Sequence, residues 1–205
     1  MHRIVDLLLA LLLIIVSAPL WILVILTLLL FSPGNPFFTH ERVGRNGAPF
    51  LLVKFRTMRS AGRPGSELTV SGDARVTRIG RVLRRFKLDE IPQLLNILAG
   101  DMTFVGPRPE SPAYVKHYSA AQRQVLDYLP GLTDPASLKY RHEEQVLASY
   151  ADPERAYLER ILPDKLKLSL EYQKNRGLLS DIKIMGATVA AIFRRHHDSA
   201  GKRQT

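Results

Sequence analysis

The sequence contains no cysteine, and this absence removes several kinds of chemistry. Disulfide bonds, thiolate metal sites and cysteine nucleophiles are all excluded. Other signatures are missing too: there is no Gly-rich phosphate loop that ends in Lys-Ser or Lys-Thr, no Gly-x-Gly-x-x-Gly and no Asp-x-Asp pair. The six histidines also lack the spacing of a zinc site. Candidate chemistry is therefore sought among basic side chains and carboxylates.

Charge is also missing from residues 7–31, which form an apolar run without Asp, Glu, Lys or Arg. As one helix this run would be roughly 37 Å long, whereas the hydrocarbon core of a bilayer is about 30 Å thick. The apolar part of an ordinary signal peptide is only about 7–15 residues long. The run therefore predicts a membrane anchor rather than a cleaved signal.

Pro19 lies near the middle of this run and predicts a kink or a break, because proline lacks the backbone donor of a helix. Ser17 can satisfy carbonyl groups that such a break frees. Basic residues lie on both sides of the run, Arg3 before it and Arg42, Arg45 and Lys54 after it. By the positive-inside rule, both flanks of the apolar run favour the cytoplasm, which permits a re-entrant helix–break–helix. A kinked helix that spans the membrane remains the alternative.

The remaining sequence predicts an α+β fold that is mainly helical. A small β-hairpin is expected over residues 37–58, where Asn46-Gly47 is the turn signal between two apolar stretches. Apolar residues at helical spacing predict two amphipathic helices, at residues 79–86 and 91–98. The first of these helices carries arginines over much of its remaining surface.

Three parts are expected along the chain. Residues 1–36 form the membrane segment, residues 37–195 the main domain and residues 196–205 a disordered basic tail. Within the main domain Met102–Val105 is a strand candidate, and the chain beyond residue 110 is expected to be mostly helical. The last apolar segment, Leu178–Arg195, suits either the core or a helix in the membrane interface.

Acidic residues are scarce between residues 54 and 87, where ten Lys or Arg accompany only Glu67 and Asp73. This stretch carries most of the chain's net charge of +10. One interpretation is a face beside anionic lipid headgroups, to which each basic residue contributes about 1 kcal/mol of attraction. The other is a phosphate site, because the planar fork of arginine holds two phosphate oxygens at once. The run alone does not separate the two.

Asp89 and Glu90 lie at the junction between the basic helix and the apolar helix. Asp89 is placed near the start of the second helix, where the dipole favours anions, and the surrounding arginines favour its ionised form. A carboxylate held against a phosphate site can attack phosphorus and form an acyl phosphate. The alternative is that Asp89 is only the N-cap of the second helix, and the pattern alone favours the cap.

Arg108 stands between Pro107 and Pro109. A proline on each side restricts the backbone, so the guanidinium is partly pre-organised to bind a ligand. A turn that merely contains an arginine explains the same three residues equally well.

The sequence resembles the bacterial sugar transferase family, the small monotopic phosphoglycosyl transferases that act on undecaprenyl phosphate. The strongest stretch runs from Arg84 to Asn96 and continues from Gly100 to Pro109. It contains Leu-Asp-Glu, Gly-Asp-Met and Gly-Pro-Arg-Pro in the order that is specific to the family. Residues 54–58, Lys-Phe-Arg-Thr-Met, and residues 181–184 also look like family segments.

The resemblance implies a two-step transfer of a sugar phosphate. Asp89 would attack the sugar-linked phosphorus of a UDP-sugar, release UMP and hold the phospho-sugar covalently until polyprenyl phosphate accepts it. Mg²⁺ would bind at Asp89, and Glu90 would complete the catalytic pair. The resemblance also implies that substrate is bound by Lys54, Arg56, Arg84, Pro107, Arg108 and Pro109.

The resemblance further favours the re-entrant form of residues 1–36, with amphipathic helices in the interface around the active site. The family's usual Ser-Pro at the break is Ala18-Pro19 here, and Ser17 stands one place earlier. Residues 37–195 would then be a catalytic domain on the cytoplasmic face of the bacterial inner membrane. This enzyme would carry out the first membrane step of a surface glycan such as a capsule, an exopolysaccharide, an O-antigen or a glycoprotein.

The expected partners are a UDP-sugar, the polyprenyl phosphate lipid, the membrane and downstream glycosyltransferases, with no nucleic acid. Two other classes of protein remain as alternatives. One is a membrane-tethered nucleic-acid-binding module, in which residues 78–100 would mimic a helix-turn-helix. The other is a non-catalytic scaffold for glycan assembly. The nucleic-acid alternative leaves the Asp89-Glu90 pair and residues 106–109 unexplained.

Overall fold

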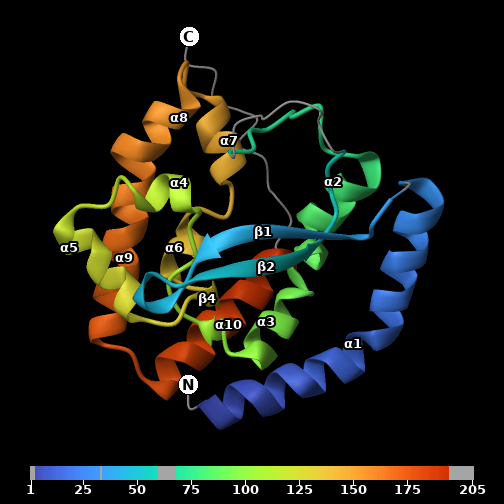
Figure 1. The fold of residues 1–205 in the computed structure, drawn as a ribbon, viewed down its shortest axis with the longest axis horizontal. Coiled ribbons are helices and arrows are strands. Elements are labelled where there is room, and N and C mark those ends of the chain that lie inside the picture. The colour runs from blue at the N-terminus through green and yellow to red at the C-terminus, as the bar shows by residue number, and fades with distance from the viewer. Residues whose placement is uncertain (1–2, 33, 60–67, 194–205) are drawn as a thin grey trace.

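The computed structural model describes residues 3–32, 34–59 and 68–193, and Figure 1 shows their arrangement. The predicted tail at residues 196–205 lies outside the described residues. The described helices are α1 (Arg3–Phe31), α2 (Arg78–Arg85), α3 (Gln93–Ala99), α4 (Pro112–Val115), α5 (Ala120–Arg123), α6 (Pro135–Lys139), α7 (Glu143–Ala148), α8 (Pro153–Ala156), α9 (Leu162–Lys174) and α10 (Leu178–Phe193). The chain is mainly helical with little sheet, as predicted.

The predicted hairpin is confirmed, with strands longer than the apolar stretches suggested. β1 (Phe37–Val43) pairs with β2 (Pro49–Phe55) in an antiparallel ladder that starts with Phe37 opposite Phe55. At the turn Asn46 and Gly47 have φ of 57° and 76°, a left-handed conformation that these two residue types tolerate. The long ladder lies across the middle of the molecule in Figure 1 and gives β2 contact with α3.

A second, very small sheet was not predicted as a pair. β3 (Thr103–Val105) agrees with the expected strand, and it pairs in parallel with β4 (Gly131–Thr133) from the helical half of the chain. The backbones then approach so closely that a Cβ on Gly131 would lie 2.1 Å from the amide nitrogen of Gly106. Only glycine fits there, and the pairing positions the loop that follows Gly106.

The described residues form three apolar clusters in the interior. One lies among α4, α9 and the segments between them, with Tyr114, Tyr157 and Leu166 among its members. A second joins α3 and β3 to the first half of α1 through Ala10 and Ile97, both fully buried. The third joins α2 and β2 to the second half of α1. Each half of α1 thus packs against the main domain through a different cluster.

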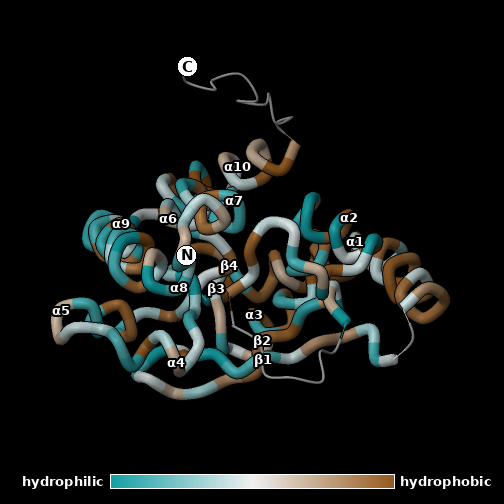
Figure 2. The backbone as a smooth tube through the Cα atoms, turned by 90° about the horizontal axis from the view of Figure 1, so that it is seen from above, coloured by the Kyte–Doolittle hydropathy of each residue, from teal (hydrophilic) through white to brown (hydrophobic). Residues whose placement is uncertain are grey.

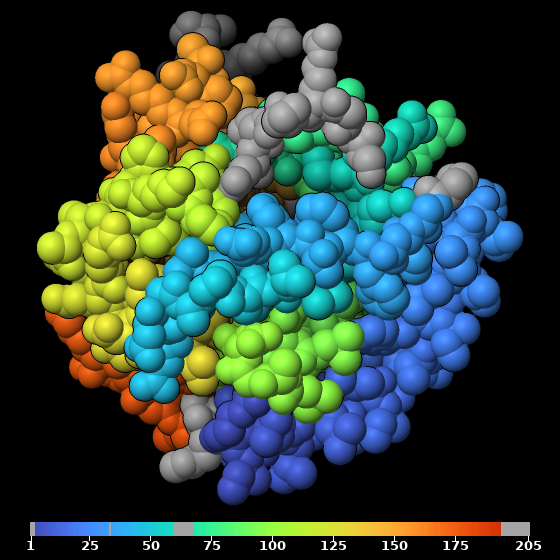
Figure 3. All heavy atoms as spheres, in the orientation of Figure 1, coloured from blue at the N-terminus to red at the C-terminus, as the bar shows by residue number. Residues whose placement is uncertain are grey.

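α1 is a continuous helix through Pro19, and the predicted break takes the form of a bend that Figure 1 shows near the middle of the helix. Ser17 lies two residues before Pro19 and donates from Oγ to the carbonyl oxygen of Leu13 at 2.6 Å, while Trp21 Nε1 donates to Ser17 Oγ at 3.0 Å. α1 is long and apolar enough to cross a membrane, and most of its side chains are exposed. Figure 3 shows it along one edge of the molecule, in contact with α3.

Both ends of α1 are tied to the main domain by polar contacts. Near its start, Arg3 donates to the carbonyl oxygens of Leu98 and Met102, each at 3.3 Å. Just after its end, the carbonyl oxygen of Ser32 accepts a hydrogen bond from Arg56. The bend therefore lets one long helix return to the body from which it starts.

α10 packs on one side against the core, which was one of the two placements that the sequence left open. Ile184 and Met185 pack against the cluster around α3, and Thr188 Oγ1 lies 2.7 Å from Thr133 Oγ1 of β4. On the other side Leu179 and Phe193 are each 75% exposed. Figure 2 shows apolar stretches on both α1 and α10. One face of α10 therefore belongs to the core, and the opposite face leaves apolar side chains uncovered.

A buried charged cluster joins Glu110, directly after Pro109, to the C-terminal helices. The carboxylate of Glu110 accepts hydrogen bonds from Tyr157 Oη and from Lys165 Nζ, the latter at 3.4 Å, and it lies 3.5 Å from Arg42 Nη1. Burial opposes ionisation, but attraction to Lys165 and Arg42 outweighs it and lowers the pKa of Glu110. The ionised carboxylate thus fixes the end of the segment that carries Arg108.

Glu110→Gln is expected to lower the free energy of unfolding by about 2 kcal/mol at neutral pH, because it removes the carboxylate that Arg42 faces and leaves the buried Lys165 with Glu143 alone. A lowered pKa means that this contribution is fully present above the ordinary value near 4.5 and is lost as the pH falls below it. The deficit of the variant should therefore shrink in acid. Denaturant unfolding of detergent-solubilised protein at neutral and acidic pH measures both effects.

The exposed Glu159→Gln is the matched control, because Glu159 pairs with Arg155 at the surface. Its effect should stay within about 0.5 kcal/mol at either pH. If Glu110→Gln is no more destabilising than this control, the cluster does not hold the segment as described.

Candidate active site

Asp89 and Glu90 share one 3₁₀ turn, Leu88–Glu90, between α2 and α3. Lys87 precedes it with φ of 55°, a left-handed conformation that costs a non-glycine residue roughly 1–3 kcal/mol. Lys87 connects the end of α2 to this turn, in which both carboxylates are buried: Asp89 is 6% and Glu90 is 8% exposed. The N-cap of α3 is Pro92, so the interpretation of Asp89 as only an N-cap is wrong.

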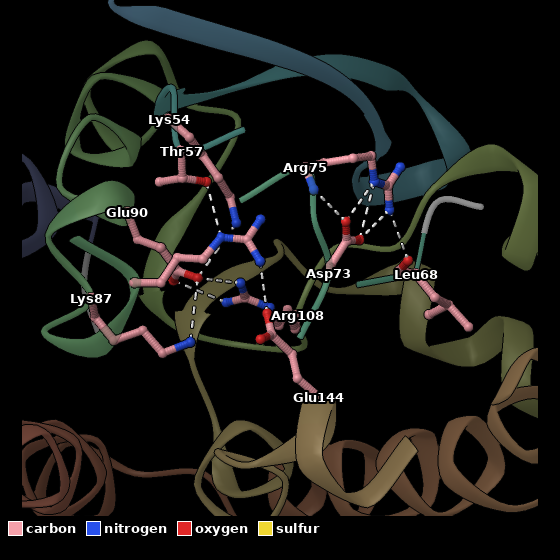
Figure 4. Close-up of polar contacts among 10 residues, drawn as sticks. Lys54, Thr57, Leu68, Asp73, Arg75, Lys87, Glu90, Arg108 and Glu144 are labelled. Atoms are coloured by element: carbon pink, nitrogen blue, oxygen red, sulfur yellow. Dashed lines mark hydrogen bonds and ion pairs between the residues drawn. The ribbon is translucent and has the colours of Figure 1, made fainter. Parts of the chain in front are cut away.

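Glu90 is the centre of a cluster of cations from three parts of the chain (Figure 4). Arg108 holds it with two hydrogen bonds, Nη2 to Oε1 at 2.6 Å and Nη1 to Oε2 at 3.2 Å. The Nζ atoms of Lys54 and Lys87 lie 3.4 and 3.7 Å from Oε1. Burial opposes ionisation of Glu90, but attraction to Arg108, Lys54 and Lys87 holds its pKa well below the usual range. Glu90 is therefore a fixed anion.

Asp89 lies in the opposite electrostatic situation. Its Oδ1 is buried and has no hydrogen-bond partner. Burial, together with repulsion from Glu90, raises the pKa of Asp89, and the nearby Lys54, Lys87 and Arg84 reduce that shift. The sequence suggested that arginines favour the ionised form, but it did not reveal the burial that opposes them. Asp89 is thus a carboxylate whose negative charge is not fully compensated by the protein.

An oxygen atom without a partner is a requirement for a metal ligand. Mg²⁺ is commonly held by one or two carboxylates together with substrate phosphates. Asp89 Oδ1 meets this requirement, whereas both oxygens of Glu90 are engaged with cations. No group of three His, Asp or Glu gathers in the described part of the chain. The residues present therefore fit an ion that is shared between Asp89 and a bound phosphate.

Arg84 reaches the site from α2 because that helix packs directly on the end of β2. A Cβ on Gly80 would lie 2.0 Å from the carbonyl oxygen of Thr57, so glycine allows this contact. Arg84 Nε then donates to Thr57 Oγ1 at 2.9 Å, and Nη1 donates to Glu144 Oε1 at 2.7 Å. The side chain is held from two sides before any ligand binds.

The structure brings together Lys54, Arg84, Arg108, Asp89 and Glu90, which the sequence selected. Arg56 is placed elsewhere, because its guanidinium binds Ser32 at the end of α1. Pro107 and Pro109 line a small hollow beside Arg108 with Tyr118 and Tyr128.

Besides Lys87, which the sequence placed only in the basic run, two polar residues of the site were not predicted. Thr57 lies within the Lys-Phe-Arg-Thr-Met segment, so its place next to a selected arginine was a usable signal. Glu144 is the second residue of α7, sixty residues away from Arg84, and carries no local signal. Its role depends on a tertiary contact.

Comparison with known proteins gives matches along almost the whole chain. The sequence model described as "Bacterial sugar transferase" matches residues 1–195. The UDP-glucose:undecaprenyl-phosphate glucose-1-phosphate transferase of Caulobacter vibrioides is 38% identical, over 93% of this chain and 69% of its own length. The exopolysaccharide production protein ExoY of Sinorhizobium fredii is 34% identical, over 91% of this chain and 83% of its own.

A further relative is larger than this chain. The UDP-N-acetylgalactosamine-undecaprenyl-phosphate N-acetylgalactosaminephosphotransferase of Aeromonas hydrophila is 32% identical, over 92% of this chain and 42% of its own length. This chain thus spans less than half of that protein. The match to the family model over residues 1–195, together with these relatives, shows that the chain belongs to the bacterial sugar transferase family.

Proposed function

We propose that this enzyme moves a sugar 1-phosphate from a UDP-sugar to a polyprenyl phosphate through a covalent intermediate on Asp89. The observation that supports this most is the buried Asp89 Oδ1, which has no partner and lies beside a cluster of cations. The Caulobacter and Aeromonas relatives are both named for transfer to undecaprenyl phosphate, although their sugars differ. The donor class is therefore UDP-sugars, and the acceptor is a lipid phosphate.

In the first step a carboxylate oxygen of Asp89 attacks the phosphorus that carries the sugar. The bond from that phosphorus to the bridging oxygen breaks, and UMP leaves with the electron pair. In the second step an oxygen of the lipid phosphate attacks the same phosphorus, the acyl phosphate bond breaks, and Asp89 is restored as a carboxylate. Asp89 would be the residue that holds Mg²⁺, and the ion would supply neutralisation of the phosphate charge.

Glu90 acts by orienting the cations that surround the phosphates. Its low pKa makes it a weak base at neutral pH, which argues against a role as proton acceptor. Its two oxygens hold Arg108 by both terminal nitrogens and bring Lys54 and Lys87 to the same point. A lipid phosphate is already ionised and needs no general base. We therefore assign Glu90 to positioning rather than to proton transfer.

The direct test is nucleotide release by the purified chain in detergent with Mg²⁺ and a panel of UDP-sugars. Without lipid, about one equivalent of UMP per enzyme is expected, and added polyprenyl phosphate should allow many turnovers. A membrane-tethered nucleic-acid-binding module or a non-catalytic scaffold would release no UMP with any sugar. Neither alternative gives Asp89 a reason to be buried without a partner.

The enzyme is proposed to act at the cytoplasmic face of the inner membrane, with α1 re-entrant. Arg3 and Ser32, at opposite ends of α1, both bind the main domain, and the bend lies between them. A straight helix of 29 residues would separate its ends by roughly 43 Å. The return of the second end to the same body supports a helix that enters and leaves on one side.

Because the chain has no cysteine, single thiols can report this topology cleanly. Ile4→Cys and Asn35→Cys place one thiol at each end of α1, and both native residues are exposed. We expect both variants to react with a membrane-impermeant maleimide only from the cytoplasmic side of the membrane. Labelling of Ile4→Cys from the periplasmic side would instead show a spanning helix.

The relative from Sinorhizobium fredii is named for exopolysaccharide production. We accordingly propose that this chain starts the assembly of a surface glycan. Its product, a sugar linked to a lipid by a diphosphate, has free hydroxyl groups on the sugar. The next reaction is therefore a glycosyl transfer onto that sugar, carried out by glycosyltransferases at the same membrane face.

A further inference from the structure

The cations of the site are all engaged with carboxylates of the protein. Glu90 binds Arg108, Lys54 and Lys87, and Glu144 binds Arg84. Asp89 and Glu90 are themselves buried. A nucleotide diphosphate therefore competes with these carboxylates for the donor atoms that they already occupy, Nη1 in the case of Arg84.

The two carboxylates differ greatly in how firmly they are held. Glu90 is buried and is shared by three cations, so its removal would leave several charges without a partner. The side chain of Glu144 is 49% exposed and binds Arg84 alone. Ion pairs of this exposed kind are screened by water and contribute little. Glu144 is the carboxylate that a phosphate can displace at the lower cost.

Arg84 stays in place when Glu144 leaves. Its Nε donates to the hydroxyl of Thr57, a buried residue just after the end of β2, and the close contact at Gly80 fixes α2 there. The Nη1 hydrogen that Glu144 accepts would then point at whatever anion replaces the carboxylate. An arginine held in this way is a pre-organised hydrogen-bond donor to a phosphate.

The exchange requires only a rotation of the Glu144 side chain, because the backbone around it is anchored. The carbonyl oxygen of Glu144 accepts from the amide of Ser71 at 3.0 Å, and the adjacent Glu143 pairs with the buried Lys165 at 2.9 Å. Side-chain rotation at the surface takes place in picoseconds to nanoseconds. Release of Arg84 is therefore fast compared with turnover.

We propose that Glu144 is a gate carboxylate, which occupies the phosphate position on Arg84 in the free enzyme and is displaced by the diphosphate of the donor. The inference rests on the proposed function and deepens it. Any anion that binds Arg84 in place of Glu144 must first break the ion pair between them, so Glu144 lowers the affinity of Arg84 for that anion by the free energy of this pair. Anions that bind Arg84 weakly do not displace it, whereas a nucleotide diphosphate, with further contacts to Mg²⁺ and Arg108, does.

The test is the dissociation constant for UDP, measured by calorimetry on the full-length protein in detergent with Mg²⁺. Glu144→Gln keeps the size of the side chain and removes its charge, and it should tighten UDP binding about three- to fivefold, as expected for loss of one exposed ion pair. In an Arg84→Gln background the same substitution should change nothing, because the competing pair is already gone. Glu159→Gln, which removes a surface carboxylate from an ion pair with Arg155, is the matched control.

Three outcomes overturn the gate. They are unchanged or weaker UDP binding in Glu144→Gln, an equal gain in the Arg84→Gln background, or an equal gain in the Glu159→Gln control. Glu144→Ala serves as a second variant and should give a gain of the same sign. UMP release separates this inference from the proposed function: a wild-type enzyme that binds UDP and releases no UMP overturns only the function, and an active enzyme with unchanged binding in Glu144→Gln overturns only the gate.

Discussion

Asp89→Asn is expected to lower UMP release by at least about 10³-fold while the protein remains folded. The amide has almost the same shape as the carboxylate but is a much weaker nucleophile toward phosphorus, so the covalent step fails. Because burial and Glu90 raise the pKa of Asp89, its ionised form destabilises the folded state at neutral pH. The neutral amide removes this repulsion, so the variant should melt at the same temperature as the wild type or at a higher one.

Activity and thermal unfolding of one preparation check both parts of this expectation. Asp127→Asn is the matched control, since Asp127 is an exposed aspartate in a 3₁₀ turn outside the site. It should keep wild-type activity. Residual activity of Asp89→Asn within about tenfold of the wild type would rule out a nucleophilic role for Asp89, and loss of stability would show that its charge is structural.

Arg108→Ala is expected to have the second largest effect, a rise of roughly 10- to 100-fold in KM for the UDP-sugar. This range corresponds to loss of charge-assisted hydrogen bonds, which contribute about 1.5–3 kcal/mol each. The substitution also removes the cation that holds both oxygens of Glu90. The Glu90 carboxylate is then no longer fixed, so it no longer aligns Lys54 and Lys87. Steady-state kinetics with varied donor concentration measures the change.

Arg108→Lys separates charge from geometry. Lysine keeps the positive charge but has a single ammonium instead of a planar fork, so we expect a KM between those of the wild type and Arg108→Ala. Arg155→Ala removes an exposed arginine from a surface ion pair and is the matched control for net charge. Unchanged kinetics in Arg108→Ala would remove this arginine from the substrate site.

The elements that the sequence predicted best are those with a strong local pattern. Asn46-Gly47 defined the hairpin turn, and the apolar spacing of α2 and α3 placed both helices to within a few residues. The pairing of β3 with β4 had no such pattern, because each strand has three residues and the contact joins distant parts of the chain. Its only trace in the sequence was a pair of glycines, Gly106 and Gly131, whose close contact appears only in three dimensions.

Within the site, residue types were predictable and their environments were not. The run of basic residues and the Asp89-Glu90 pair could be selected from spacing and from the family resemblance. Whether the charge of each carboxylate is neutralised depends on which cations face it in the folded chain. Arg108 reaches Glu90 across eighteen residues, whereas Asp89 Oδ1 remains without a partner. Arg56 illustrates the same limit, because it shares the basic run and yet binds the end of α1.

The attachment of α1 at both ends also bears on the position of Asp89. α3 packs along the first half of α1, and the turn with Asp89 directly precedes α3. Any displacement of α1 would therefore be transmitted to Asp89 through a connection of a few residues. With α1 re-entrant, as proposed, this connection would fix the height of Asp89 above the bilayer, so that a lipid phosphate could reach it by lateral diffusion without leaving its leaflet.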